Sequence, residues 1–181
     1  SSGSIFLNVV DLSTYVVTQY VPLPGMETFG GSCPIVTDDT HLYIATENSS
    51  NKFYKILMSN MTLVSTTIWT NNIYGAHSGY INKAKTEAYF AGGTGAWIAK
   101  LNLANMPYVD LKLDIGGNCD EMAYIPYDAS PNASNLVVLC QKNHSVNAGT
   151  IVNMDTMTQY TIPLMGGSCM YFSEVTNKIY N

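Results

Sequence analysis

Apolar and polar residues alternate in short runs along the chain, and the stretch from Cys33 to Trp69 shows this pattern most clearly. It reads "CPIVTDDTHLYIATENSSNKFYKILMSNMTLVSTTIW", with four runs rich in Val, Ile, Thr and Tyr. The turn-forming segments "TDDT", "ENSSN" and "SNMT" separate these runs. Runs of this length and composition between turn formers predict β-strands. We therefore expect four short antiparallel strands in this stretch.

The same pattern recurs with a nearly constant period. Three copies open on "GGSC", "GGNC" and "GGSC", which end at Cys33, Cys119 and Cys169. A fourth copy opens on "YGAHSGYI", with His77 in the cysteine position. The four positions are 44, 42 and 50 residues apart, and the polar turns of the second hairpins are 48, 43 and 53 residues apart. Two independent sets of positions with one period indicate a true repeat.

Four antiparallel strands that recur every roughly 40–50 residues are typical of a β-propeller, whose four-stranded sheets are called blades. We predict an all-β fold and one propeller region over residues 1–181. The expected segments are the end of one blade, three complete blades and the start of a fifth, at 5–24, 30–73, 74–115, 116–165 and 166–181. They fit either part of a ring of about six to eight blades or a closed ring of four, whose ends share one blade. The chain stops inside an apparent strand, which favours the larger ring.

One segment comes close to a helical pattern. It is "INKAKTEAYFAGG" at residues 81–93. The other units have their first hairpin at the equivalent place, so we expect a hairpin here as well. Trp69 and Trp97 fall in expected strands, and we expect both to pack between blades.

Several segments match a known type of repeat. "VVDLSTYVVTQYVPLP" and then "THLYIATENSSNKFYKI" resemble the YVTN-type and quinoprotein-like propeller repeats, and "VTNKIYN" at 175–181 fits the same pattern. The resemblance extends over almost the whole chain and implies the propeller fold. It implies no reaction, because propellers carry many unrelated functions.

The composition narrows the choice of partners. The chain is 46% hydrophobic but only 12% charged, and its net charge is −5. A nucleic-acid-binding protein needs a basic surface to neutralise phosphates, so we expect no nucleic-acid partner. No apolar run approaches the roughly 20 residues that span a bilayer, so we expect no membrane span in this segment.

The four cysteines suggest one disulfide and leave a second open. A hairpin that pairs Ala123 with Leu136 would place Cys119 opposite Cys140. The β-carbons of directly opposed residues are close enough for the two sulfur atoms to form a disulfide. We therefore predict a Cys119–Cys140 disulfide.

Cys33 and Cys169 occupy equivalent positions in the first and last units. They could form a second disulfide if those blades are neighbours, as in a closed ring of four. Together with His77 and Cys119 they could also form a Cys₃His zinc site. Equivalent positions around a propeller channel stand too far apart for bonds near about 2.3 Å. We therefore expect neither a metal nor a cofactor.

The chain contains four N-glycosylation sequons. They begin at Asn48, Asn60, Asn132 and Asn143, and all four fall in expected turns. Sequons, few charges and an even number of cysteines together favour an extracellular, secreted or cell-surface protein with N-linked glycans. Because the sequons lie on both faces of the expected propeller, the blade edges remain as surfaces for packing against other proteins.

No catalytic constellation is evident, so we expect no enzyme. His41, His77 and His144 are isolated, and the neighbouring acids Asp120 and Glu121 would point to opposite faces of a strand. The favoured function is a structural or adhesive glycoprotein that packs against other protein chains, including copies of itself. The alternatives are a ligand-binding propeller, for example for carbohydrate, and a fragment of a quinoprotein-like enzyme or a lyase. The absence of arginine weakens the recognition of carboxylates and other anions that an enzyme of this kind would need.

Overall fold

The computed structural model describes residues 5–25, 33–46, 52–68, 75–82, 84–92, 97–105, 111–115, 119–125, 136–143, 146–163 and 171–180. Within these ranges the secondary structure consists of strands and turns. The strands are β1 Phe6–Asp11, β2 Val16–Pro22, β3 Ile35–Thr37, β4 His41–Ala45, β5 Lys52–Leu57, β6 Thr62–Ile68, β7 Ala76–Ile81, β8 Glu87–Gly92, β9 Trp97–Asn102, β10 Leu111–Asp114, β11 Cys119–Ile125, β12 Leu136–Asn143, β13 Val146–Asn153, β14 Thr158–Pro163, β15 Tyr171–Ser173 and β16 Lys178–Tyr180.

The strands form three complete four-stranded sheets and two hairpins. The complete sheets have the orders β3-β4-β5-β6, β7-β8-β9-β10 and β11-β12-β13-β14, and the hairpins are β1-β2 and β15-β16. Strands that are neighbours in a sheet are antiparallel and consecutive in sequence. This arrangement confirms the prediction of an all-β fold built from four-stranded antiparallel blades. It includes the hairpin β7-β8 in the segment that resembled a helix.

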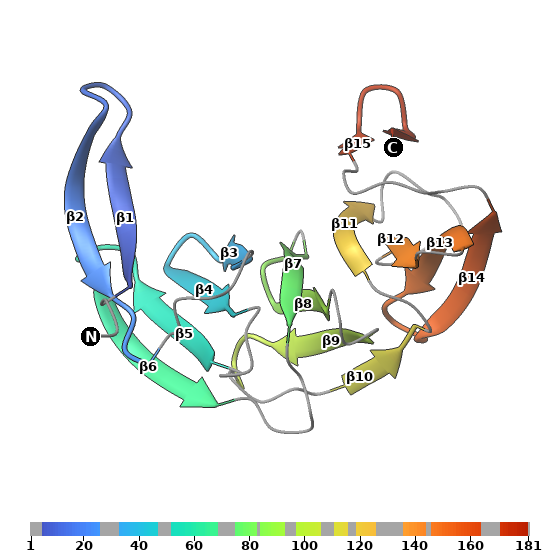
Figure 1. The fold of residues 1–181 in the computed structure, drawn as a ribbon, viewed down its shortest axis with the longest axis horizontal. Coiled ribbons are helices and arrows are strands. Elements are labelled where there is room, and N and C mark those ends of the chain that lie inside the picture. The colour runs from blue at the N-terminus through green and yellow to red at the C-terminus, as the bar shows by residue number, and fades with distance from the viewer. Residues whose placement is uncertain are drawn as a thin grey trace.

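The sheets stand side by side along an open arc, with β3, β7, β11 and β15 on its inner side and β6, β10 and β14 on its outer side (Figure 1). The N-terminal hairpin β1-β2 and the C-terminal hairpin β15-β16 lie at opposite ends of the arc (Figure 1). The two hairpins therefore do not combine into one blade of a closed ring of four in this structure (Figure 1). The larger ring stays a prediction. In the described part of the chain, no helix is long and apolar enough to cross a membrane.

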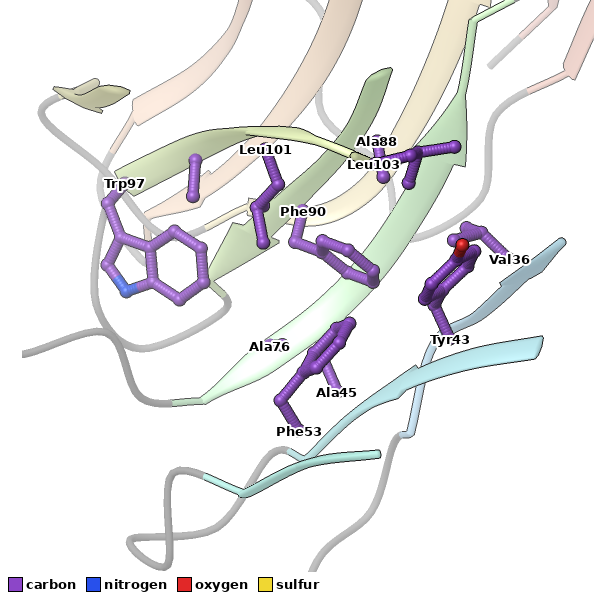
Figure 2. Close-up of a cluster of buried hydrophobic side chains, with 11 residues drawn as sticks. Val36, Tyr43, Ala45, Phe53, Ala76, Ala88, Phe90, Trp97, Leu101 and Leu103 are labelled. Carbon is purple, nitrogen blue, oxygen red and sulfur yellow. The ribbon is translucent and has the colours of Figure 1, made fainter. Parts of the chain in front are cut away.

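Aromatic side chains fill the space between the first and second complete sheets. Phe53 of β5 meets Phe90 of β8 edge-on, with 6.0 Å between ring centroids, and stacks on Tyr43 at 6.2 Å. Trp97 is fully buried in the same cluster (Figure 2). The prediction that Trp97 packs between blades is confirmed, whereas Trp69 lies outside the described residues.

Two further clusters complete the packing on either side. One lies between the N-terminal hairpin and the first complete sheet and centres on Val21, Leu23, Ile44, Tyr54 and Ile56. The other joins the second and third sheets and includes Tyr89, Ala91, Ile98, Val152 and Met154. The first and second complete sheets are therefore covered by apolar contacts on both of their faces, as face-to-face packing of blades requires.

The register of the β11-β12 hairpin differs from the one that the sequence suggested. Ala123 lies opposite Val138, not Leu136, because both strands continue to the pair formed by Ile125 and Leu136. An irregularity between Cys119 and Glu121 then shifts the pairing. As a result, Cys119 is opposite Gln141 and Cys140 is opposite Glu121. The prediction that Cys119 is directly opposite Cys140 is wrong. The disulfide itself stays a prediction, because the side chains of these strands are not among those described.

Gly92 is required by the close approach of Trp97. A β-carbon at Gly92 would overlap Cε2 and Nε1 of the indole ring, which is fully buried and has little room to move. We expect Gly92→Ala to lower the free energy of unfolding by about 1–3 kcal/mol through overpacking. Leu12→Ala, at a side chain that is 80% exposed, should change it by less than about 0.5 kcal/mol. Denaturant titrations of both variants test this, and equal stabilities would show that Trp97 can shift.

Candidate functional site

Among the residues whose side chains the structure describes, the largest group of exposed apolar side chains is on the N-terminal hairpin. Phe6, Val10, Val17 and Tyr20 are 36–64% exposed, and we call them the hairpin face. Val10 pairs with Val17 across the hairpin, and the rings of Phe6 and Tyr20 meet edge-on at 6.3 Å. Tyr20 is opposite Asn8, which lies between Phe6 and Val10 along β1. Alternate residues of a strand share one side of the sheet, so the four apolar side chains are on the same side, with Asn8 among them.

The hairpin face lies on the side opposite to the one that packs on the next sheet. Val21 is buried and Leu7 is partly buried against the first complete sheet, and the two form a cross-strand pair. Residues of a strand alternate between its faces, so the hairpin face points away from that sheet. In the complete sheets the corresponding side is covered by a neighbouring sheet. The hairpin face is therefore half of an inter-blade contact.

The C-terminal hairpin is also exposed. Tyr171 and Tyr180 are opposite each other, at 67% and 51% exposure, and Val175 in the turn is almost fully exposed. Tyr180 donates a hydrogen bond to Oγ1 of Thr176 at 3.1 Å, which holds its ring beside the turn. Both ends of the arc thus present large apolar side chains to solvent.

A second candidate is the polar group around Asp38, in the turn between β3 and β4. Oδ1 of Asp38 accepts the backbone N–H groups of Thr40 at 2.8 Å and His41 at 2.6 Å, and Oδ2 accepts the Tyr43 hydroxyl at 2.7 Å. Nδ1 of His41 is 3.6 Å from Oδ2 of Asp38. Every one of these partners comes from the same hairpin, so the carboxylate holds the turn together.

The pKa shifts agree with that structural role. Burial alone would raise the pKa of Asp38, but the hydrogen bonds from the His41 amide, the Tyr43 hydroxyl and the Thr40 amide outweigh it and hold the pKa below its ordinary value. Burial and the bond to Asp38 raise the pKa of Tyr43. The carboxylate is therefore ionised and the phenol neutral at physiological pH, and neither is poised to exchange a proton.

The carboxylates of Asp39 and Glu87 connect strands and sheets. Asp39 forms an ion pair with Lys85 of the neighbouring sheet's first turn. Glu87 accepts the Tyr89 hydroxyl at 2.7 Å and pairs with Lys100 at 2.7 Å. Among the residues for which the structure gives side chains, no group of three or more His, Cys, Asp and Glu could hold a metal ion.

The predicted glycosylation sites are only partly within the described ranges. Asn60 is exposed in the turn between β5 and β6, and its Oδ1 accepts the backbone N–H of Thr62 at 3.1 Å. Asn143 is the last residue of β12 and is opposite Val146 of β13. Asn48 and Asn132 lie outside the described residues. Nothing in the structure tests whether any of the four carries a glycan.

The cysteines and histidines singled out from the sequence are also only partly within the described ranges. Cys33 is half-buried and packs against the cluster between the N-terminal hairpin and the first sheet. Burial, and to a lesser extent the nearby Cys33 thiol, raises the pKa of Tyr54 to about 12. Cys169 and His144 lie outside the described part of the chain, so the predicted pairing of Cys33 with Cys169 stays untested. His77 lies on the innermost strand β7.

The hairpin face was not identified from the sequence. The alternation of "FLNVVD" in β1 predicts a strand, and in a propeller both sides of such a strand are expected to be buried. The available signal was the position of this strand in the outer half of an incomplete blade. That position leaves one side without the neighbour that the repeat would otherwise supply.

Comparisons with known proteins bear on the fold. The chain matches no protein-family model and no curated protein sequence. It superimposes on Kuenenia stuttgartiensis hydrazine synthase with a TM-score of 0.67 and 11% identity, over 88% of this chain and 44% of the other. It superimposes on the structure of U3-55K with a TM-score of 0.67 and 10% identity, over 88% of this chain and 46% of the other. Both are β-propeller proteins. The fold is a β-propeller.

The comparisons also limit what can be carried over. This chain spans less than half the length of either structure. At 10–11% identity the likeness shows the propeller architecture alone. The function must therefore be argued from the surface of this chain.

The role of Asp38 can be tested by substitution. We expect Asp38→Ala to lower the free energy of unfolding at pH 7 by about 1–3 kcal/mol, because a hydrogen-bonded charged acceptor is lost. The folded-state pKa of Asp38 is depressed. Its contribution is therefore present above the unfolded pKa of about 3.9 and is lost as pH falls through the lower folded pKa.

Denaturation of wild type and variant from pH 7 downwards measures this difference, which should narrow below about pH 4. Asp39→Asn is the matched control, because it removes a carboxylate that is 70% exposed and paired with Lys85 at the surface, and asparagine tolerates the positive φ of 71° at this position. The control should cost less than about 1 kcal/mol. Equal losses for the two variants would contradict the structural role of Asp38.

Proposed function

We propose that this propeller is a non-enzymatic assembly module of an extracellular or cell-surface glycoprotein, which packs against other protein chains. The observation that carries the proposal is the hairpin face, an exposed apolar surface on one end of the arc. Exposed apolar surfaces of this kind mark sites of protein–protein contact. Aromatic residues such as Phe6 and Tyr20 are also those that interfaces favour at their centres.

The charge distribution supports a protein partner. The hairpin face contains no charged residue, and the whole chain has only eight basic residues and no arginine. Such a surface suits contact with another apolar protein surface, and offers little to phosphates or carboxylates. The ionisable side chains around Asp38 and Glu87 are occupied in holding turns and strands, which suits a module without catalytic chemistry.

The extracellular location rests on the sequons and cysteines. Asn60 is exposed in a turn, and because its Oδ1 accepts the Thr62 amide, its Nδ2 is left for modification. A disulfide between Cys119 and Cys140 would suit an oxidising compartment. The proposal also takes the repeats to be of the YVTN type, in keeping with the segments that resemble it.

The compartment can be tested by mass spectrometry of natively sourced protein, with and without glycosidase and reductant. We expect glycan mass on Asn60 and on at least one further sequon, and a peptide pair joined through Cys119 and Cys140. Unmodified asparagines together with four reduced thiols would contradict an extracellular location.

The assembly role can be tested by hydrogen exchange on natively sourced material and on the isolated chain. We expect amides in residues 6–22 to exchange more slowly in the native material, because the partner covers the hairpin face. Residues 62–68 of β6 are the control, since they belong to a complete sheet. If no surface of the propeller is protected in the native material, the assembly function is wrong.

A further inference from the structure

The outer strand β6 of the first complete sheet has a free edge. β6 lies on the outer side of the arc, and among the described strands it is hydrogen-bonded to β5 alone (Figure 1). β2 of the N-terminal hairpin comes near β6 but is not paired with it. The sheet is complete and lies within the chain, so this edge is a property of the four-stranded blade. Unpaired N–H and C=O groups along such an edge can accept another strand.

The sequence of β6 favours the addition of a strand. β6 reads "TLVSTTI", with five β-branched residues and no charge, proline or glycine. Uncharged segments of six or seven residues with high β-propensity are those that most readily pair edge to edge. Val64 and Ile68 are 52% and 60% exposed, so apolar side chains accompany the unpaired backbone groups.

The outer strands of the other two complete sheets carry protection in their own sequences. β10 is only four residues long and contains Lys112. β14 ends on Pro163, which has no backbone N–H to donate. Short length, lysine and proline are devices by which natural proteins prevent edge-to-edge pairing. β6 has none of the three.

The one protective feature of β6 is an irregularity near its start. It leaves Val64 without a partner in β5, between Leu63 and Ser65, which are both paired. From Ser65 to Ile68 the pairing with β5 is regular again. A bulge distorts an edge only where it occurs. The edge at residues 65–68 therefore remains open to a further strand.

A predicted glycosylation site lies directly before this strand. Asn60 and Thr62 are the first and last residues of a sequon, and Thr62 is also the first residue of β6. Asn60 is exposed, and its Oδ1 accepts the backbone N–H of Thr62 at 3.1 Å. This hydrogen bond ties the Asn60 side chain to the start of β6. A glycan on Nδ2 of Asn60 would therefore be anchored beside the free edge.

We infer that an N-linked glycan on Asn60 shields the free edge of β6 and prevents other strands from pairing with it. This role rests on the proposed glycoprotein function and gives one of the predicted glycans a purpose. In the modification, Nδ2 of Asn60 forms a bond to the anomeric carbon of an oligosaccharyl diphosphate. The bond from that carbon to the diphosphate breaks, and the diphosphate leaves with the proton that Nδ2 loses. The attached sugar is bulky and solubilising, so it obstructs the approach of a second strand.

The second sequon whose asparagine is described has a different setting. Asn143 is at the end of β12, an inner strand that is paired with β11 on one side and β13 on the other. A glycan there has no free edge of its own strand beside it. The role of an edge shield therefore belongs to Asn60. It also removes the edge of β6 from the surfaces that can pack against other protein chains.

Two variants at Thr62 test the shield. Thr62→Ala destroys the sequon and Thr62→Ser retains it, while both lose the threonine methyl group and keep the backbone N–H that Asn60 accepts. Both chains are purified from cells that add N-glycans and compared by sedimentation velocity. We expect Thr62→Ala to self-associate at a concentration about tenfold lower than Thr62→Ser. Equal association of the two, with a glycan found on Asn60 of Thr62→Ser by mass spectrometry, would overturn the inference.

Hydrogen exchange and a rescue variant locate the contact. Amides of residues 65–68 should exchange more slowly in associated Thr62→Ala than in the dilute protein, because new strands pair at this edge. Adding Val64→Lys to Thr62→Ala should restore the association of Thr62→Ser, because an edge lysine opposes pairing. Protection confined to other residues, or a double variant that associates as readily as Thr62→Ala, would show that the edge of β6 is not the contact.

The shield and the proposed function can fail separately. Native material with glycans on other sequons but none on Asn60 would retain the glycoprotein and overturn the shield. A glycan on Asn60 together with equal association of the two Thr62 variants would do the same. Native material without a glycan on any sequon would overturn both.

Discussion

Face-to-face packing of apolar sheets is the interaction on which the rest of this structure depends. Tyr43, Phe53 and Phe90 fill one contact between sheets. Trp97 is buried in the same cluster and lies so close to Gly92 that a larger residue would overlap its ring. A sheet with such contacts on both faces, such as the second complete sheet, has neither face exposed to solvent. Almost every described residue of β8 and β9 is consequently buried. A propeller blade buries both of its faces only between two neighbours, and each of the two hairpins exposes large apolar side chains.

The polar residues serve this packing by fixing where strands turn. Asp38 accepts two turn amides and the Tyr43 hydroxyl, so the turn and an aromatic ring of the inter-sheet cluster are held by one carboxylate. Asp11 accepts the amides of Ser13 and Thr14 in an equivalent way in the N-terminal hairpin. The Ser13 hydroxyl and these amides lower the pKa of Asp11. Asp38 and Asp11 therefore both act as turn residues that fix where a hairpin reverses direction.

The repeat could be predicted from the sequence because each unit folds by local rules. Hairpins joined by short turns pair consecutive strands, so the period of the turns is enough to give sheets such as β3-β4-β5-β6 and to separate a hairpin at 81–93 from a helix. The register of β11-β12 could not be predicted, because a single irregularity between Cys119 and Glu121 shifts the pairing and leaves no trace in composition. The hairpin face was missed for another reason. Its residues Phe6 and Tyr20 have the pattern of buried positions, and only the three-dimensional arrangement shows that their side chains are exposed.

The two ends of the arc are related by the same constraint that builds its middle. An edge strand such as β1 has unpaired backbone groups as well as an apolar face, so a partner that supplies only a flat apolar surface would satisfy half of what the hairpin lacks. A hairpin with the geometry of β15-β16 satisfies both, since it adds hydrogen bonds along the edge and continues the blade.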